Sequence, residues 1–163
     1  MLASEETTKH MKAALKEAVK AFDKDEVPVG AIVVHNNQVI GKGYNQTETL
    51  KDPTAHAEMI AITAAANHMG NWRLNECDIY VTLEPCIMCA GAIMNARIKN
   101  IFFAEFDPKF GACGSLYNLP GENKYNYRIN VFSGLCENES RSLLQEFFRN
   151  LRLIEKQKPG SFS

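Results

Sequence analysis

Two short motifs constrain what this chain can fold into more than any other feature. The first reads His56-Ala57-Glu58, and the second reads Pro85-Cys86-Ile87-Met88-Cys89. One imidazole and two thiolates suit Zn²⁺, and a His plus Cys₂ set leaves the fourth tetrahedral position open, as in catalytic sites. The fold must therefore bring a histidine and a Cys-x-x-Cys pair from separate segments to one metal ion.

An open position on such an ion predicts hydrolytic chemistry. Zn²⁺ lowers the pKa of a bound water from ~15.7 to about 7, which supplies hydroxide as a nucleophile at neutral pH. Cys86 and Cys89 are three residues apart, so both sulfurs can face one metal from the first turn of a helix. The N-terminus of a helix also favours the thiolate form through its dipole.

Two simpler interpretations compete with an open zinc site. The cysteines could pack as small hydrophobic residues, but Pro85 directly before them and the upstream His-x-Glu argue against it. A structural zinc site would need a fourth protein ligand, for which His68, Cys77 and Cys113 are the candidates. None of these three is paired in spacing with another ligand, so the open site is favoured.

The role of Glu58 stays open on spacing alone. It follows His56 by two residues, and helical positions two apart point to opposite sides. A glutamate in the first turn of a helix is commonly a surface residue that matches the helix dipole.

Composition sets broad limits on the protein. The chain has 163 residues, 45% of them hydrophobic, which predicts one domain with a packed core. The net charge of −1 neither supports nor excludes a nucleic-acid partner. We expect no secretory signal and no membrane segment, and therefore a cytoplasmic protein. Five cysteines, two of them in a C-x-x-C pair, fit metal binding in a reducing compartment.

Hydrophobic periodicity predicts helices and strands in alternation. A hairpin turn is expected at residues 35–38, a loop at 45–53 and an irregular stretch between 105 and 130, while Thr7 or Thr8 is expected to cap the first helix. The expected helices cover residues 7–23, 55–69, 86–96 and 139–156, and the expected strands cover 31–34, 39–44, 78–82, 101–104 and, as a short strand or an extended segment, 131–133. This order implies a layered α/β domain with a mixed sheet.

The two motifs resemble the H-x-E and P-C-x-x-C signature of zinc-dependent nucleobase deaminases. Further blocks resemble bacterial tRNA-specific adenosine deaminases in particular, and the match runs in order over about residues 7 to 153. These blocks are residues 27–31, 52–58, 81–92 and 111–116. The resemblance implies a three-layer α/β/α cytidine-deaminase-like domain with a mixed sheet of roughly five strands. Residues 1–163 would form one catalytic domain, with a core over about 7–153 and a frayed tail at 157–163.

The resemblance also implies a division of roles. His56, Cys86 and Cys89 would hold one Zn²⁺ per subunit, and hydroxide would attack C6 of adenine to give inosine. Glu58 would take the proton from the bound water and deliver it to the purine ring and the leaving ammonia.

The implied substrate is a tRNA anticodon stem-loop whose wobble adenosine is extruded into the pocket. Asn45 and the backbone N–H of Ala57 would hold the flipped base, and Val29 would line the pocket wall. The simpler interpretation of Asn45 is a loop residue that satisfies its own turn. The resemblance further implies a homodimer.

Candidate RNA contacts lie in two segments, a loop near residue 107 and the last helix. Residues 141–158 contain five basic and two acidic residues, a local charge of +3 that could meet phosphates. A solvated face of an amphipathic helix explains this strip equally well, and its phenylalanines suit a core as much as base stacking. The candidates are Asp107, Lys109, Phe147, Phe148, Arg149 and Arg152.

The chain departs from the resemblance in places that concern the substrate. Phe106 and Phe110 are apolar where more polar residues are expected, and residues 123–127 have no clear counterpart. An enzyme that deaminates free guanine or cytosine with the same zinc site is therefore the alternative function. A third hypothesis is a zinc-stabilised binding module without activity, which requires a fourth protein ligand.

Overall fold

The computed structural model describes residues 3–122 and 124–160 of the chain. Its elements are α1 (Glu5–Asp23), β1 (Gly30–His35), β2 (Gln38–Tyr44), α2 (Thr47–Leu50), α3 (Ala57–Met69), β3 (Cys77–Leu83), α4 (Ile87–Asn95), β4 (Asn100–Glu105), the 3₁₀ helix η1 (Leu119–Gly121), β5 (Asn130–Ser133) and α5 (Glu137–Gln157). The alternation expected from the sequence is confirmed.

One mixed sheet has the strand order β2-β1-β3-β4-β5. The hairpin partners β1 and β2 are antiparallel, as are β1 and β3, whereas β3, β4 and β5 run parallel. Asn36 and Asn37 adopt positive φ angles of 49° and 63° in the predicted hairpin turn, a conformation that asparagine tolerates better than most residues.

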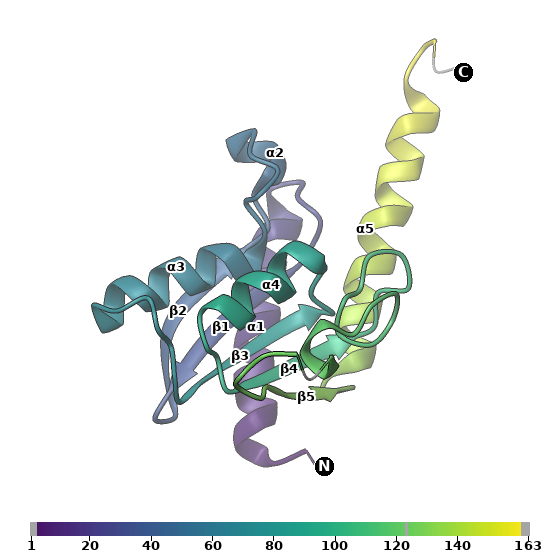
Figure 1. Cartoon of the computed structure of the whole chain (residues 1–163). Coiled ribbons are helices and arrows are strands. Elements are labelled where there is room, and N and C mark those ends of the chain that lie inside the picture. The colour runs from purple at the N-terminus through teal and green to yellow at the C-terminus, as the bar shows by residue number, and fades with distance from the viewer. Residues whose placement is uncertain (1–2, 123, 161–163) are drawn as a thin grey trace.

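Helices cover both faces of the sheet (Figure 1). Side chains of β1 alternate between two hydrophobic cores, with Ala31 and Val33 facing α3 and α4, and Ile32 and Val34 facing α1. This is the three-layer α/β/α arrangement predicted from the sequence. The close packing of α3 against β2 requires a glycine at position 43, because a Cβ at Gly43 would lie 2.3 Å from the carbonyl oxygen of Ala57.

Three local predictions are corrected by the structure. Ser4, and not Thr7 or Thr8, caps α1, and its side chain accepts a hydrogen bond from the backbone N–H of Thr7 in a capping box. The expected loop at 45–53 contains α2, because the buried carboxylate of Glu26 accepts bonds from the N–H groups of Glu48 and Thr49. His56 is the N-cap of α3 and does not lie in its first turn.

The last helix extends beyond the rest of the molecule (Figure 1). Every residue from Phe148 to Gly160 is exposed, and α5 ends at Gln157, where the sequence predicted a frayed tail. The final residues of that tail, 161–163, lie outside the described part, as does Asn123. Across residues 3–122 and 124–160, no helix combines the length and apolar character needed to cross a membrane.

Candidate metal centre and substrate pocket

The three predicted ligands meet at one point. His56 Nδ1 lies 3.6 Å from Cys86 Sγ and 3.4 Å from Cys89 Sγ, and all three atoms lie within 4.8 Å of one another. Imidazole nitrogen and thiolate sulfur around one tetrahedral Zn²⁺ are expected to be about 3.6 Å apart, given Zn–N and Zn–S bonds of about 2.1 and 2.3 Å. The donor set and its spacing therefore fit a zinc ion.

Two helix N-termini deliver these ligands. His56 caps α3 and Cys86 caps α4, both with extended backbone, and neither side chain makes a capping hydrogen bond. Cys89 follows within the first turn of α4 and is fully buried. Because helix N-termini stabilise negative charge, the start of α4 favours a thiolate at Cys86.

The polar contacts of the cluster favour one negative charge, on Cys86. A hydrogen bond from Cys89, together with one from His56, lowers the pKa of Cys86 to about 4, while burial acts in the opposite direction. The same bond to Cys86 and burial raise the pKa of Cys89. The hydrogen bond to Cys86 raises the pKa of His56. The thiols and the imidazole thus share protons that a bound cation would displace.

Glu58 lies beside the cluster, which spacing alone did not predict. Its side chain is only 4% exposed, and it lines the same pocket as His56. The extended backbone of the N-cap (φ −77°, ψ 153°) explains this, because the helical rotation between positions two apart does not apply to His56. Burial raises the pKa of the Glu58 carboxyl, so its protonated form is favoured relative to a glutamate in water.

A fourth protein ligand is absent from the described residues. His68 is exposed at the far end of α3, and Cys77 begins β3. Cys113 is buried, but it does not join the cluster. Among residues 3–122 and 124–160, only the His56, Cys86 and Cys89 group has the spacing of a metal site. A zinc ion held by these three ligands would keep one coordination position open, as catalytic zinc sites do.

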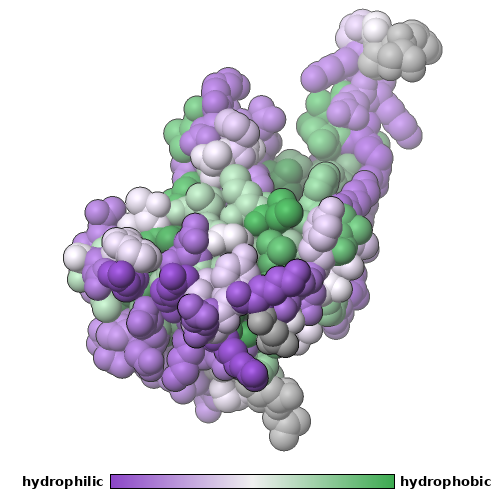
Figure 2. Space-filling view, in the orientation of Figure 1, coloured by the Kyte–Doolittle hydropathy of each residue, from purple (hydrophilic) through white to green (hydrophobic). Residues whose placement is uncertain are grey.

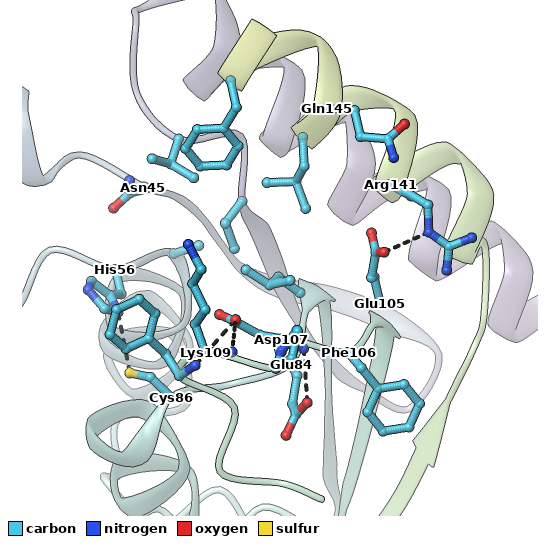
Figure 3. A pocket seen from close by; sticks show the side chains of 18 of the residues that line it. Asn45, His56, Glu84, Cys86, Glu105, Phe106, Asp107, Lys109, Arg141 and Gln145 are labelled. Carbon is cyan, nitrogen blue, oxygen red and sulfur yellow. Dashed lines mark hydrogen bonds and ion pairs between the residues drawn. The ribbon is translucent and has the colours of Figure 1, made fainter. Parts of the chain in front are cut away.

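A pocket of about 1440 Å³ opens over the cluster (Figure 3). Val29, Asn45 and Ala57, the residues that the resemblance assigns to the base, line it. Asn45 is 8% exposed, and its backbone N–H binds the Val29 carbonyl. Its side-chain amide has no hydrogen-bond partner among the described residues, so the amide does not stabilise the loop in which Asn45 lies. Ala57 is the first residue of α3, where backbone N–H groups have no partner within the helix.

Two further segments form the outer walls of the pocket. Asp107 and Lys109 belong to the loop that follows β4, and Phe148, Arg149 and Arg152 project from α5. Phe147 does not line the pocket. It is half-buried, and its ring lies against Phe22 of α1 with a centroid distance of 6.1 Å.

The structure adds pocket residues that the sequence did not single out. Glu84, Glu105 and Arg141 all line it, and Arg141 binds Glu105 at 2.7 Å (Figure 3). The only sequence signal of the two glutamates is position, because Glu84 and Glu105 stand at the C-terminal ends of neighbouring parallel strands, whereas Arg141 belongs to the basic strip of residues 141–158. Binding sites of α/β folds gather at such strand ends.

Apolar surface surrounds the mouth of the pocket. Figure 2 shows hydrophobic residues in the region between α4 and α5. Ile87 and Phe110 line the pocket and are 56% and 68% exposed. Leu116, which follows the loop of residues 106–115, does not line the pocket but is 55% exposed.

Comparison with known proteins places this geometry in context. Residues 5–152 match the family model of the MafB19-like deaminases. The tRNA-specific adenosine deaminase of Bacillus subtilis is 46% identical over 147 residues, which cover 90% of this chain and 91% of that protein.

Solved structures show the same relationship. A structure from a study of A-to-I editing by tRNA:A34 deaminases at the wobble position is 44% identical with a TM-score of 0.81, covering 84% of this chain and 99% of that one. A guanine deaminase from Bacillus subtilis is 37% identical with a TM-score of 0.58, covering 64% of this chain and 66% of that one.

Proposed function

The chain belongs to the MafB19-like deaminase family and to its tRNA-specific adenosine deaminases, and we propose that it converts the wobble adenosine of a tRNA anticodon loop to inosine. The observation that carries this proposal is the match to the tRNA:A34 deaminase structure, which extends over 99% of that chain. The guanine deaminase of Bacillus subtilis is less similar, at 37% identity and a TM-score of 0.58, than the tRNA:A34 deaminase structure, at 44% and 0.81. The alternative, deamination of a free base, is thereby disfavoured.

The size of the pocket supports a large substrate. Sites for small molecules commonly have volumes of about 300–1,000 Å³, and this pocket of about 1440 Å³ is larger. A nucleobase would fill the inner part near Asn45 and Ala57. The outer part would remain for flanking nucleotides against the 106–115 loop and α5. Single-stranded RNA loops suit such a site because their unstacked bases can enter a pocket one at a time.

We propose that His56, Cys86 and Cys89 hold one Zn²⁺. When bound, this ion would supply a water molecule whose pKa is lowered toward neutrality. The net reaction replaces the amino group at C6 of adenine by oxygen from water, and it releases ammonia.

The remaining work falls to the protein's own side chains. Glu58 would carry the two protons of the water in turn, the first to the ring nitrogen and the second to the leaving amine. Its raised pKa, a consequence of burial, suits a carboxyl that must carry a proton. The free amide of Asn45 and the N–H of Ala57 would bind the edge of the flipped base, and Val29 would pack against it.

We further infer that residues 1–163 act as one catalytic domain and assemble as a homodimer. Support for one domain is the single sheet, which takes strands from residues 30 to 133 and is covered by helices from both ends of the chain.

Support for a dimer is the exposed apolar surface of Ile87, Phe110 and Leu116 beside the pocket. Sedimentation equilibrium would test this assembly. We propose a cytoplasmic location for the protein, because the proposed tRNA substrate would be found there.

A direct assay tests the proposed function. The zinc-loaded protein is incubated with an anticodon stem-loop that carries adenosine at the wobble position, and inosine is measured by nucleoside mass spectrometry. A matched stem-loop with its only loop adenosine outside the wobble position serves as a control. We expect inosine only at the wobble position. Ammonia release from free guanine or cytosine, without inosine in the stem-loop, would overturn the proposal in favour of a free-base deaminase.

A further inference from the structure

We propose that Glu84 is a positioning residue that fixes the 106–115 loop as a wall of the substrate pocket. This inference rests on the proposed function, because the loop is taken to contact the RNA. Glu84 is only 3% exposed, and it stands two residues before the candidate ligand Cys86. It would act on the substrate through the loop and not on the reacting atoms.

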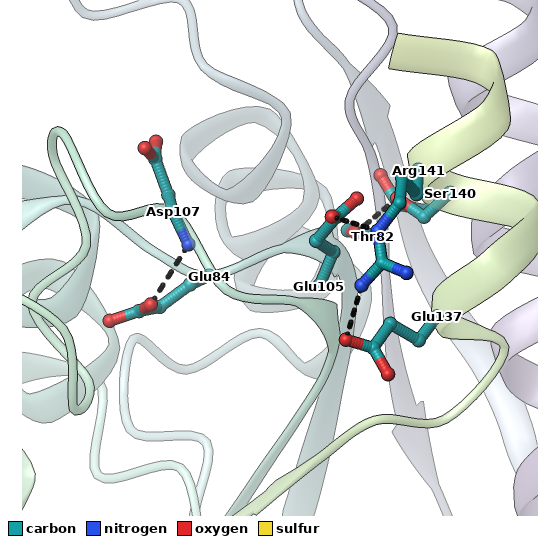
Figure 4. Close-up of polar contacts among 7 residues, drawn as sticks. All are labelled: Thr82, Glu84, Glu105, Asp107, Glu137, Ser140 and Arg141. Carbon is teal, nitrogen blue, oxygen red and sulfur yellow. Dashed lines mark hydrogen bonds and ion pairs between the residues drawn. The ribbon is translucent and has the colours of Figure 1, made fainter. Parts of the chain in front are cut away.

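The hydrogen bonds of the Glu84 carboxylate all come from one loop. Oε1 accepts the backbone N–H of Asp107 at 3.0 Å (Figure 4) and the hydroxyl of Ser115. Oε2 accepts the N–H groups of Cys113 and Ser115, both at 3.0 Å. A carboxylate offers about four acceptor positions. All are occupied by the loop, which leaves none to bind a metal ion or a substrate.

The other hydrogen bonds of this loop join it mostly to itself and to residues 116–119, and few reach the rest of the protein. Residues 106–115 contain no helix or strand of the sheet, so their backbone N–H groups need partners elsewhere. Ala112 donates to the carbonyl of Pro85 at 2.8 Å, and a single β-bridge joins Gly111 to Cys86. The loop is therefore aligned directly on the segment that carries a candidate metal ligand.

Gly111 gives independent support for this arrangement. A Cβ at this position would lie 2.3 Å from both the Oε2 atom and the carboxyl carbon of Glu84. Only glycine lets the loop backbone pass this close to the carboxylate. The sequence thus provides the small residue that the contact between Glu84 and the loop requires.

The consequence concerns the substrate wall. The part of the loop between the two ends held by Glu84 carries Asp107, Pro108, Lys109 and Phe110, which line the pocket. Figure 3 shows Lys109 and Asp107 on the same side of the pocket as His56 and Cys86. Release of the loop would therefore displace the groups that meet the RNA while leaving His56, Cys86 and Cys89 in place.

Glu84→Gln is the sharpest test, because it keeps the volume and removes one acceptor. The N–H groups of the new amide would face N–H donors of the loop, and two donors that face each other cannot both form a hydrogen bond. We expect unchanged zinc content, kcat at saturating stem-loop within about threefold of wild type, and KM raised about tenfold or more. Hydrogen exchange should accelerate at the amides of Asp107, Cys113 and Ser115, but not in α4.

Two variants complete the experiment. Ser115→Ala removes one donor and should shift KM and exchange in the same direction by less, which keeps the test valid if Glu84→Gln does not fold. Glu17→Gln is the matched control, since Glu17 is also buried but binds Lys20 away from the pocket. Unchanged KM and unchanged loop exchange in Glu84→Gln would refute the inference, as would zinc loss with KM unaltered. Absence of inosine with the wild-type protein would instead refute the proposed function, and the exchange measurement would still test Glu84.

Discussion

The floor and the walls of the pocket are built in different ways. The floor consists of two helix starts, where His56 caps α3 and Cys86 caps α4, and within each start the functional residues lie within three positions of one another. The walls are the 106–115 loop and α5, which are held by the Glu84 and Glu105 side chains and the Thr82 carbonyl at the ends of β3 and β4 (Figure 4). Each half of the floor is thus set by the local structure of one helix start, whereas the walls are held in place by contacts with distant segments. Changes to the floor should abolish the reaction, and changes to the walls should weaken substrate binding.

The largest expected effect comes from the removal of a metal ligand. Cys86→Ala leaves two protein ligands, so we expect metal affinity to fall by at least about a hundredfold and turnover to disappear. Metal analysis after gel filtration, with the stem-loop assay, measures both. Cys77→Ala is the matched control, because Cys77 is fully buried but lies outside the cluster. Full zinc content in Cys86→Ala would show that the floor is not a metal site.

The next effect separates proton transfer from metal binding. Glu58→Gln keeps the shape of a buried side chain and removes its capacity to accept a proton. Turnover should fall by about 10²–10⁴-fold, the usual contribution of a general acid or base, while zinc content stays at the wild-type level. Single-turnover inosine formation measures the loss. More than about a tenth of wild-type turnover would remove Glu58 from the proposed mechanism.

The same contrast explains what the sequence could predict. The five strands, the long helices and the meeting of His56 with the two cysteines follow from local periodicity, capping and ligand spacing. Helix α2 could not be predicted, because it forms where the distant carboxylate of Glu26 accepts two of its N–H groups. The burial of Glu58 depends on a backbone angle at His56 that spacing does not encode.

The walls were harder to predict for the same reason. In the sequence, nothing distinguishes Glu84 from its neighbours in the motif before Cys86. In the structure, its carboxylate accepts hydrogen bonds from four donors of the 106–115 loop. Phe147 and Phe148 are adjacent and alike in sequence, yet Phe147 packs against α1 and Phe148 lines the pocket. Only the tertiary structure separates such neighbours.

A smaller effect is expected where α5 meets the substrate. The double variant Arg149→Ala and Arg152→Ala should weaken stem-loop binding about tenfold at physiological salt and reduce the slope of log affinity against log salt by about 0.7 to 0.9 per lost phosphate contact. Fluorescence anisotropy over a salt series measures the slope. Lys42→Ala on β2, which is exposed and outside the pocket, is the control. An unchanged slope would mean that this face of α5 is only solvated.

The smallest expected effect is on stability, and it concerns the hydrogen bond that joins α5 to the sheet. Ser140 is 1% exposed and donates its hydroxyl to the Thr82 carbonyl at 2.5 Å, next to the ion pair of Arg141 with Glu105 (Figure 4). Ser140→Ala should lower the free energy of unfolding by ~1–2 kcal/mol, because a buried carbonyl loses its partner. Ser142→Ala, exposed two positions along the helix, should change it by less than about 0.5 kcal/mol. Urea unfolding of both variants makes this comparison. Since Ser140 lies outside the metal cluster, both variants should keep the zinc content of the wild type. A loss of zinc in Ser140→Ala would mean that the floor and the walls are coupled more tightly than their separate contacts indicate.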